Sequence, residues 1–211
     1  MPAPRKNLRI LPREFYDRDP RDVSRELLGK VLVRREGKKI LKGRIVEVEA
    51  YLGEGDPAAH AAAGRTARND ALFGPPGHAY VYFIYGNHWC FNVSCLPDGI
   101  GGGVLFRALE PLEGIKDMAQ ARHVNIRADR DLKFLTSGPG RLAEAFGITR
   151  ERDNSKDLTS RRCDLFIADD GFVPPRIVES PRIGITKAAD LPLRYLIPGN
   201  LYVSGKKVCI P

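Results

Sequence analysis

The chain has 211 residues, with 34 Lys or Arg and 26 Asp or Glu, so its formal net charge is +8. A hydrophobic fraction of 43% can fill one core, and it excludes a disordered tail protein, a collagen and a coiled coil. No apolar run approaches the roughly 18 residues that a transmembrane helix needs. The positive charge favours an anionic partner, with nucleic acid as the first choice.

The four cysteines are too few for a disulfide scaffold in a chain of this length. We expect free thiols, because only Cys90 and Cys95 are closely spaced and no second pair follows them. This spacing argues against a zinc site. The sequence therefore predicts neither a bound metal nor another cofactor.

The first third of the chain predicts a helix and a basic hairpin. The helix runs from Asp19–Pro20 to a glycine stop at residue 29. Residues 31–35 and 40–52 predict the two strands of the hairpin. Seven cations, which we call the basic hairpin residues, are Lys30, Arg34, Arg35, Lys38, Lys39, Lys42 and Arg44. They either contact an anionic partner or protect an edge strand from pairing with another chain.

A long loop and a second hairpin follow. Residues 53–78 are rich in Gly, Pro, Ala and Asp, and structureless loops of that length are often functional. Two aromatic runs then flank Gly86-Asn87, which predicts a hairpin with a two-residue turn. This register pairs Tyr82 with Phe91. It leaves Tyr85 at the tip, either as an exposed wedge or as a ring folded back onto the hairpin.

The rest of the chain predicts a mixture of short elements. These are a strand at 104–110, helices at 111–122 and 139–146, a charged surface loop at 149–162, and strands near 163–168, 176–186 and 194–208, the last as a pair. The fold class expected is α+β, a single compact domain with a mixed, mostly antiparallel curved sheet, hairpins and flanking helices. We expect residues 1–8 to be a basic tail and residues 9–211 to be the domain.

Two carboxylates interrupt an otherwise apolar strand. Because side chains alternate along a strand, Glu47, Glu49 and Tyr51 share one face. That face is either solvent-exposed or functional, since acidic residues are depleted in strands. Arg107 lies among leucines in a later strand, and we expect it to pair with Glu49 or Glu47. Such a pair would keep the glutamate ionised, as a general base must be.

Several strings are recognisable together: GRIVEVEAYLGEGDPAAH, GRTARNDALFGPPGHAYVYFIYGNHWCFNV, LFRALEPLEG, TSGPGRLAEAFGI and PRIGITKAADLPLRYLIPGNLYVSG. They resemble the alkyladenine (3-methyladenine) DNA glycosylase family over most of the chain. The spacing E-A-Y-x8-H together with YVYxxYG is far more specific than a single short motif. The sequence departs from the family pattern at Ala67, where T-P-R-N is common, and at Asn87, where Y-G-M is common.

The resemblance implies a catalytic group of three residues. Glu49 corresponds to the family's general base, which activates a water for attack on the sugar C1′. Arg107 would help to hold that water or the phosphate of the flipped nucleotide. Val203 would offer its backbone carbonyl to the same water.

The resemblance also implies a base pocket. Tyr51 and His60 would form one wall, and Tyr82 would stack on the other side. Asn92 would lie at the pocket mouth, although the two-residue turn puts it on the face opposite Tyr82. Tyr85 would contact DNA by filling the space that the flipped nucleotide leaves.

The expected function is that of a monofunctional DNA glycosylase in base excision repair. It would remove 3-methyladenine, 7-methylguanine, hypoxanthine or ethenoadenine and leave an abasic site. The partner would be double-stranded DNA containing damaged purines, with no membrane, no metal and no cofactor, and the enzyme would be a monomer. Its location would be the cytoplasm, near the nucleoid, in a bacterium, or the nucleus in a eukaryote.

Two other functions fit parts of the pattern. A non-catalytic nucleic-acid-binding module would use the basic hairpin and the aromatic rings alone. Glu49 argues against it, because a carboxylate that faces a polyanion is unfavourable unless it has a function. A glycoside hydrolase would use Glu47 and Glu49, but its two carboxylates must flank a bond at about 5–9 Å, whereas residues two apart on a strand lie side by side.

Overall fold

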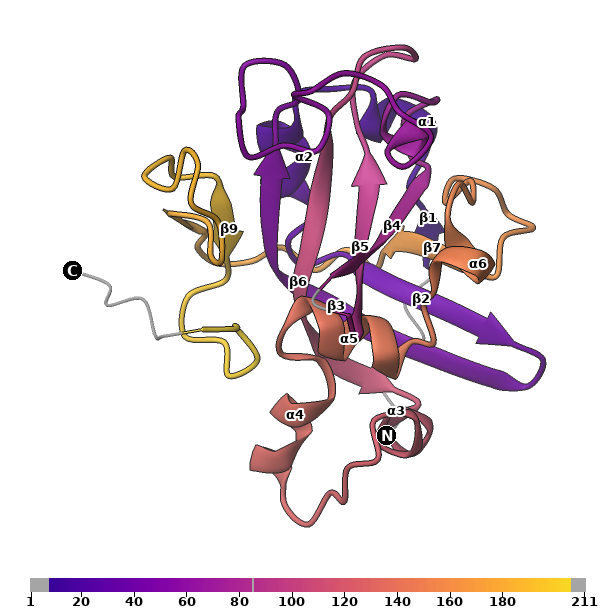
Figure 1. Ribbon diagram of the computed structural model, residues 1–211. Helices are drawn as coiled ribbons and strands as arrows, with labels where there is room; N and C mark the ends of the chain where they lie inside the picture. Colours follow the sequence, from indigo (N-terminus) through magenta and orange to yellow (C-terminus); the bar gives the residue numbers. More distant parts are fainter. Residues whose placement is uncertain (1–7, 85, 206–211) are drawn as a thin grey trace.

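The computed structural model describes residues 8–84 and 86–205 (Figure 1). Its strands are β1 (Arg9–Ile10), β2 (Val31–Glu36), β3 (Lys39–Tyr51), β4 (Ala79–Ile84), β5 (His88–Ser94), β6 (Gly103–Glu113), β7 (Leu165–Asp169), β8 (Val178–Ser180) and β9 (Arg194–Leu196). Its helices are α1 (Arg13–Tyr16), α2 (Pro20–Leu27), α3 (Ile115–Ala121), α4 (Lys133–Thr136), α5 (Pro139–Ala145) and α6 (Arg150–Asp153), with 3₁₀ turns η1 (Asp70–Leu72) and η2 (Asp129–Leu132). In this part of the chain no helix has the length and hydropathy of a membrane span.

One curled antiparallel sheet organises the molecule. The strand order is β1-β7-β2-β3-β6-β5-β4, with β9 added to β3 and β8 added to β9. Helix α5 packs against β5 and β6, and α2 packs against β3. The predicted α+β class is therefore confirmed.

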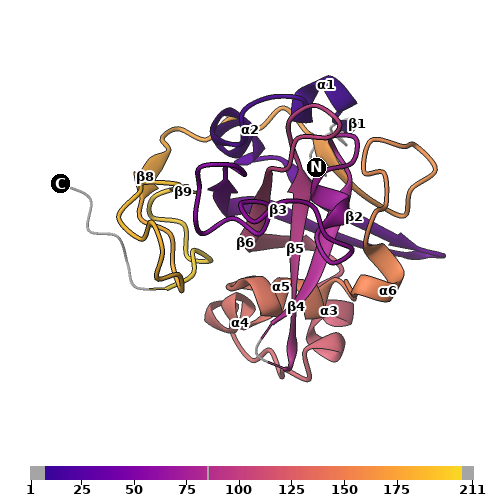
Figure 2. The same cartoon turned by 45° about the horizontal axis from the view of Figure 1, so that its top comes forward.

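Strand β3 changes its partner along one edge. Residues 39–44 pair with β2, whereas Glu47, Val48 and Glu49 pair with β9. Along the other edge β6 follows β3, with irregular register between Ile45 and Glu47 and again between Glu47 and Val48. Such bulges bend a strand and increase its twist. As a result β8 and β9 lie together on the side of the molecule away from the tip of the β2–β3 hairpin (Figure 2).

Local signals place the early elements correctly. The side chain of Asp19 accepts a hydrogen bond of 2.8 Å from the amide of Arg21, which caps α2 as predicted. Gly29 follows the helix with a φ of +88°, a conformation that favours glycine. The helix expected at 111–122 begins only at Ile115, because residues 111–113 still pair with β3.

The later part of the chain departs from the prediction in two places. Residues 149–162 are not simply a surface loop, because they include α6, whose Asp153 is fully buried. In the described residues of the segment 194–208, one strand forms rather than a pair: β9 pairs with β3 and with β8.

The second hairpin has a longer connection than predicted. Ile84 pairs with His88, so three residues, 85–87, join β4 and β5. Tyr82 therefore pairs with Cys90 and not with Phe91, and the predicted two-residue turn is wrong. A shift of one residue exchanges the faces of a strand. Phe91 thus points into the core, where its ring stacks on Phe106 with a centroid separation of 4.8 Å.

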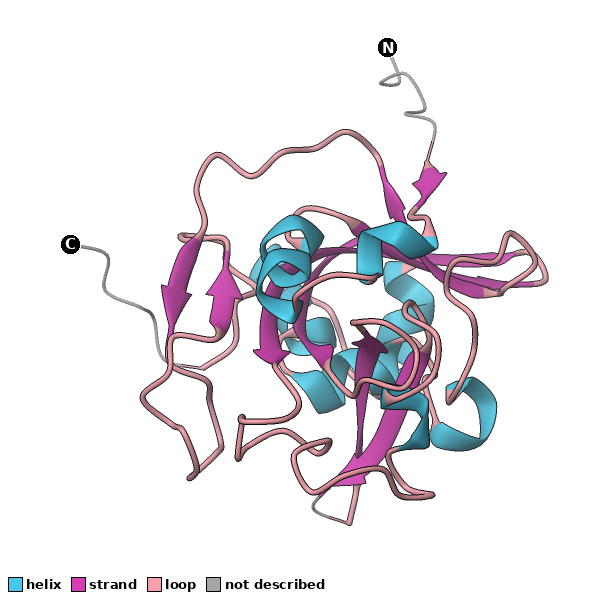
Figure 3. Cartoon of the chain, turned by 90° about the horizontal axis from the view of Figure 1, so that it is seen from above, coloured by secondary structure: helices cyan, strands magenta, loops and turns pink. Residues whose placement is uncertain are grey.

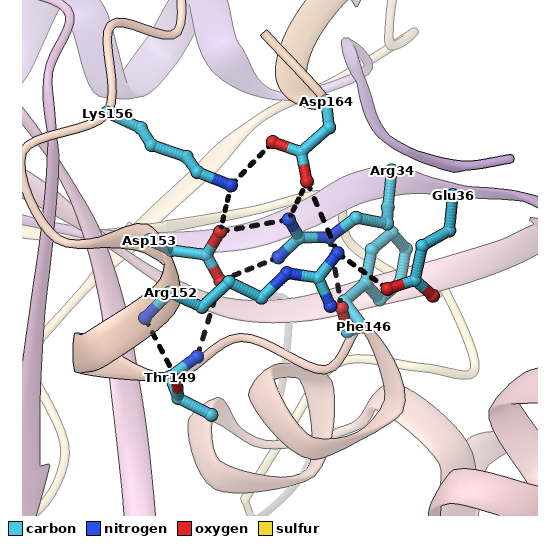
Figure 4. Close-up of polar contacts among 8 residues, drawn as sticks. All are labelled: Arg34, Glu36, Phe146, Thr149, Arg152, Asp153, Lys156 and Asp164. Carbon is cyan, nitrogen blue, oxygen red and sulfur yellow. Dashed lines mark hydrogen bonds and ion pairs between the residues drawn. The ribbon is translucent and has the colours of Figure 1, made fainter.

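Most of the basic hairpin residues are neutralised within the fold. Arg34 is fully buried and forms ion pairs with Asp153 at 2.7 Å and with Asp164 at 2.9 Å (Figure 4). Four others of the seven are paired with acidic residues elsewhere: Lys30 with Asp169, Lys39 with Asp117, Lys42 with Glu113, and Arg44 with Asp170. Seen from above, the tip of the β2–β3 hairpin projects from the body of the molecule (Figure 3). Its charge therefore serves mainly to hold the hairpin against its neighbours.

The buried Arg34 cluster predicts a large stability effect. Arg34→Ala leaves Asp153 buried with Lys156 as its remaining cationic partner. We expect the free energy of unfolding to fall by about 3–5 kcal/mol, the usual scale for breaking a buried ion pair. Chemical denaturation measures this loss. The exposed neighbour Arg35 stacks on Phe166 at 4.6 Å, and Arg35→Ala should cost about 1 kcal/mol or less. Equal losses in the two variants would contradict this account.

Candidate functional site

Two buried glutamates lie side by side in the middle of the sheet. Glu47 and Glu49 are both 0% exposed, because β6 and β9 pair with β3 on either side of them. The solvent-facing alternative for these residues is wrong. Burying two carboxylates is costly unless cations and donors surround them. The cations come from β6, which carries Arg107, and from β9, which carries Arg194.

Glu47 is held by residues from three different segments. Its Oε1 accepts hydrogen bonds from Arg107 Nε at 3.1 Å and Arg194 Nε at 2.7 Å. Its Oε2 accepts one from the backbone amide of Ser204. Arg107 Nη2 also donates to the Ser204 hydroxyl at 3.3 Å. Glu47 therefore ties three separate segments together.

Glu49 has the same number of partners as Glu47, but the partners differ in kind. Its Oε1 accepts a hydrogen bond from the amide of Ile183 at 2.8 Å and forms an ion pair with Arg107 Nη1 at 3.0 Å. Its Oε2 accepts a single hydrogen bond, of 3.0 Å, from the Tyr51 hydroxyl. A carboxylate oxygen has two lone pairs, so Oε2 can accept another proton donor. The predicted pairing of Arg107 with the glutamates is confirmed for both of them.

The surroundings of Glu49 adjust its acidity in opposite directions. Burial raises the pKa of Glu49 above the ordinary glutamate value. The positive charge of Arg107, the amide of Ile183 and the hydroxyl of Tyr51 oppose this rise. Burial also raises the pKa of Tyr51, so the phenol stays protonated and donates. Glu49 is thus a carboxylate that can both release and take up a proton.

Tyr51, the hydrogen-bond partner of this carboxylate, lines an aromatic cavity of about 230 Å³. Tyr51 lines it from the end of β3, and His60 lines it from the loop that follows. Tyr80 and Tyr82 contribute their rings from β4, with 5.5 Å between the ring centroids. The ring of His60 meets that of Tyr82 edge to face at 4.5 Å. The cavity is therefore a narrow space bounded by flat rings.

Polar contacts fix two of the lining residues. His60 Nδ1 is 2.9 Å from the Tyr80 hydroxyl, which orients the imidazole. Burial lowers the pKa of His60, and Arg68 lowers it further, so the ring is neutral at neutral pH. Asn92 Nδ2 donates to the carbonyl oxygen of Tyr80 at 3.1 Å. The three-residue connection of the hairpin brings Asn92 onto the same face as Tyr80 and Tyr82, which corrects the opposite-face expectation.

The predicted site residues fall into two neighbouring places. The small cavity brings together Tyr51, His60, Tyr82 and Asn92. Arg107 and Val203 instead line a second, larger cavity of about 910 Å³. Val203 is half-buried there, next to Ser204. Tyr85 lies outside the described residues.

Sequence reasoning missed Tyr80, Asp56 and Arg182 as parts of the site. Tyr80 lies two residues before Tyr82 on the same strand, so the alternation of side chains already placed the two rings on one face. Asp56 and Arg182 form a buried ion pair across 126 residues of sequence. No local pattern connects such distant residues. Among residues 8–84 and 86–205, no group of three or more His, Cys, Asp or Glu side chains could hold a metal ion.

Comparison with known proteins assigns the chain to a family. The family model for "Methylpurine-DNA glycosylase (MPG)" matches residues 14–201. A protein of Koribacter versatilis named "Putative 3-methyladenine DNA glycosylase" is 64% identical over 197 residues, which cover 93% of this chain and 94% of that protein. A protein of the same name from Burkholderia lata is 52% identical over 205 residues, which cover 97% of this chain and 95% of that protein. Another, from Methanoculleus marisnigri, is 50% identical over 201 residues, which cover 93% of this chain and 99% of that protein. The chain thus belongs to the methylpurine-DNA glycosylase family, and it is a DNA glycosylase whose partner is DNA.

Proposed function

We propose that this enzyme flips damaged purines out of duplex DNA and hydrolyses their N-glycosidic bonds with a water that Glu49 activates. The observation that carries this proposal is the buried Glu49 carboxylate, which accepts a hydrogen bond from Tyr51 in the lining of an aromatic cavity. The name of the relatives supports 3-methyladenine as a substrate. The resemblance noted in the sequence adds 7-methylguanine, hypoxanthine and ethenoadenine to the proposal.

The aromatic cavity supports the flipping step. Extruding a nucleotide from the duplex costs a few kcal/mol, and least for a damaged base. Each base–aromatic stacking contact recovers about 1–3 kcal/mol. Tyr51, His60 and Tyr82 supply the flat surfaces for such contacts. An N3-alkylated purine is cationic, so it is attracted to electron-rich rings and leaves without being protonated.

The identity of the partners favours Glu49 over Glu47 as the base. Glu47 accepts from two arginines and one amide, and its role is to hold these groups. Glu49 Oε2 accepts from Tyr51, which lines the aromatic cavity, and in this scheme a water on the cavity side donates to the same oxygen. Arg107 lies 3.0 Å from Glu49 and can stabilise the ionised base. In this scheme the carbonyl of Val203, adjacent to the Ser204 contact with Arg107, accepts the second hydrogen of the water.

A group of unpaired cations supports a path for the DNA backbone. The larger cavity beside Arg107 is also lined by Arg130, Lys133 and Arg141, which we call the α4–α5 basic cluster. All three are exposed, and none forms an ion pair with any described residue. The basic hairpin, in contrast, is mostly paired within the fold. We therefore place the phosphate backbone at the α4–α5 basic cluster. We further propose that the enzyme acts as a monomer.

Replacing the base tests the central step. Glu49→Gln keeps the shape of the side chain and removes its ability to take a proton. We expect the single-turnover excision rate to fall by at least about 100-fold, the lower range for a lost general base, while binding to damaged duplex persists. Glu54, which is exposed five residues later, gives the control Glu54→Gln with an unchanged rate. Turnover at the wild-type rate by Glu49→Gln would move the base to another residue.

The acidity of Glu49 predicts the pH profile. The base acts only when ionised, and burial raises its pKa, so excision of cationic 7-methylguanine should increase with pH through a midpoint above about 4.3, the ordinary glutamate value. Tyr51→Phe removes a donor to the ionised form and should move the midpoint up by about one unit. The control is Tyr16→Phe, since the buried Tyr16 hydroxyl has no partner among the described residues. Identical midpoints in all three proteins would argue against Glu49.

Salt dependence distinguishes the two basic surfaces. Each phosphate contact adds about 0.9 to the slope of log affinity against log salt concentration. The variant Arg130→Ala, Lys133→Ala, Arg141→Ala should therefore lower the slope for undamaged duplex by about two to three. The matched variant Lys38→Ala, Lys39→Ala, Lys42→Ala should leave it unchanged. A lower slope in the Lys38, Lys39, Lys42 variant and an unchanged slope in the other would place the DNA backbone at the basic hairpin instead.

A further inference from the structure

A buried ion pair links two loops that line the base cavity. Arg182 Nη1 contacts Asp56 Oδ2 at 2.6 Å, and Nη2 contacts Oδ1 at 2.8 Å. Both side chains are 0% exposed. Asp56 lies in the loop after β3, and Arg182 lies just after β8. The two residues therefore form a buried, bidentate ion pair.

Arg182 also fixes the end of the strand that carries the base. Its Nη1 donates to the carbonyl of Ala50 at 3.1 Å, and its guanidinium lies 4.6 Å from the centre of the Tyr51 ring. The residue that follows, Ile183, donates its amide to Glu49 Oε1. The position of this amide is thus set by the side chain immediately before it.

Asp56 fixes the backbone of the loop that follows β3. Its carboxylate accepts hydrogen bonds from the amides of Leu52 at 3.1 Å and Ala58 at 3.2 Å. The segment from Ala58 to Ala61, which includes His60, lines the cavity. One ion pair therefore controls the loop of His60, the ring of Tyr51 and a donor to Glu49.

Stability alone does not explain an arginine at this position. Buried ion pairs can often be replaced by apolar side chains without loss of stability. Arg182 Nε is moreover buried and has no hydrogen-bond partner in the described part of the chain. An unsatisfied buried donor is destabilising. The benefit of the pair must then lie in the geometry that it imposes.

We propose that Arg182 and Asp56 are positioning residues, which hold the Ile183 amide on Glu49 and the Tyr51 ring at the cavity so that the base keeps its reactive orientation. This inference rests on the proposed function of Glu49 as the base. The Ile183 amide lowers the pKa of Glu49. If the pair is lost, the amide and the Tyr51 hydroxyl move away and the Glu49 pKa rises. The positive charge of Arg182 also favours the ionised form of Glu49, so Arg182→Lys, which keeps this charge and loses the planar fork, separates a positioning role from a purely electrostatic one.

The test uses a double variant that leaves no buried charge unpaired, Asp56→Asn with Arg182→Met. Its matched control is Arg34→Met with Asp153→Asn, which removes an equally buried pair from the cluster of Figure 4. Three quantities are measured: the single-turnover excision rate, the dissociation constant for damaged duplex, and the Glu49 titration midpoint. Carbon-13 NMR of labelled glutamate gives the midpoint, with Glu49→Gln identifying the signal.

We expect the Asp56→Asn, Arg182→Met protein to lose about 10- to 100-fold in rate, as small misplacements of reacting groups do, with a higher Glu49 midpoint and little change in binding. The control should keep the wild-type rate and midpoint even where its melting temperature falls. Arg182→Lys is measured beside the first variant, and in its place if that does not fold, since it keeps the charge and loses the planar fork. A wild-type midpoint in the folded Arg182 variant overturns the proposal.

The NMR midpoint separates this proposal from the proposed function. A wild-type protein that excises no damaged base would contradict the function of Glu49 as the base. A shifted midpoint in the Arg182 variant would still support the positioning role, because it is measured without DNA. An unshifted midpoint together with normal excision would retain the function and remove the positioning role.

Discussion

The burial of two carboxylates on one strand is the constraint on which the site depends. Glu47 and Glu49 have no access to solvent, so charges and donors must come from the rest of the chain. Arg107 on β6, Arg194 on β9 and the amide of Ile183 supply them. Each belongs to a different segment, so the glutamates can be satisfied only when the whole sheet has closed around them. Folding and assembly of the site are therefore the same event.

The same network gives the two glutamates different roles. Two arginines and an amide hold Glu47, which makes it an anchor between segments. Glu49 shares Arg107 with it but keeps an accepting position on Oε2, toward Tyr51 and the cavity. Arg107 links the anchor to the base, so fixing one carboxylate also orients the other. The chemical difference between two identical side chains comes entirely from their partners.

Sequence reasoning succeeded where a local rule governs the structure. Alternation along β3 placed Glu49 and Tyr51 on one face, and the need to neutralise a buried arginine predicted the partners of Arg107. The predicted turn between β4 and β5 was one residue too short, which exchanged the two faces of β5. The prediction therefore put Asn92 on the face opposite Tyr82. The ion pairs of the basic hairpin and of Arg182 join distant segments, and periodicity carries no information about such contacts.

The irregular register of β3 also restricts how the chain can vary in length. Two of its three register shifts lie between Ile45 and Val48, directly before the base, and the third lies between Lys42 and Gly43. Deleting or inserting one residue there would turn Glu49 toward the opposite side of the sheet and move Arg107 out of reach. The exposed tip of the β2–β3 hairpin at Gly37, where an added Cβ would meet nothing within 4 Å, lies outside this stretch. Changes in length among related chains should therefore collect in exposed turns of this kind and be absent from the stretch of strand before Glu49, roughly four residues or about 13 Å at 3.3 Å each.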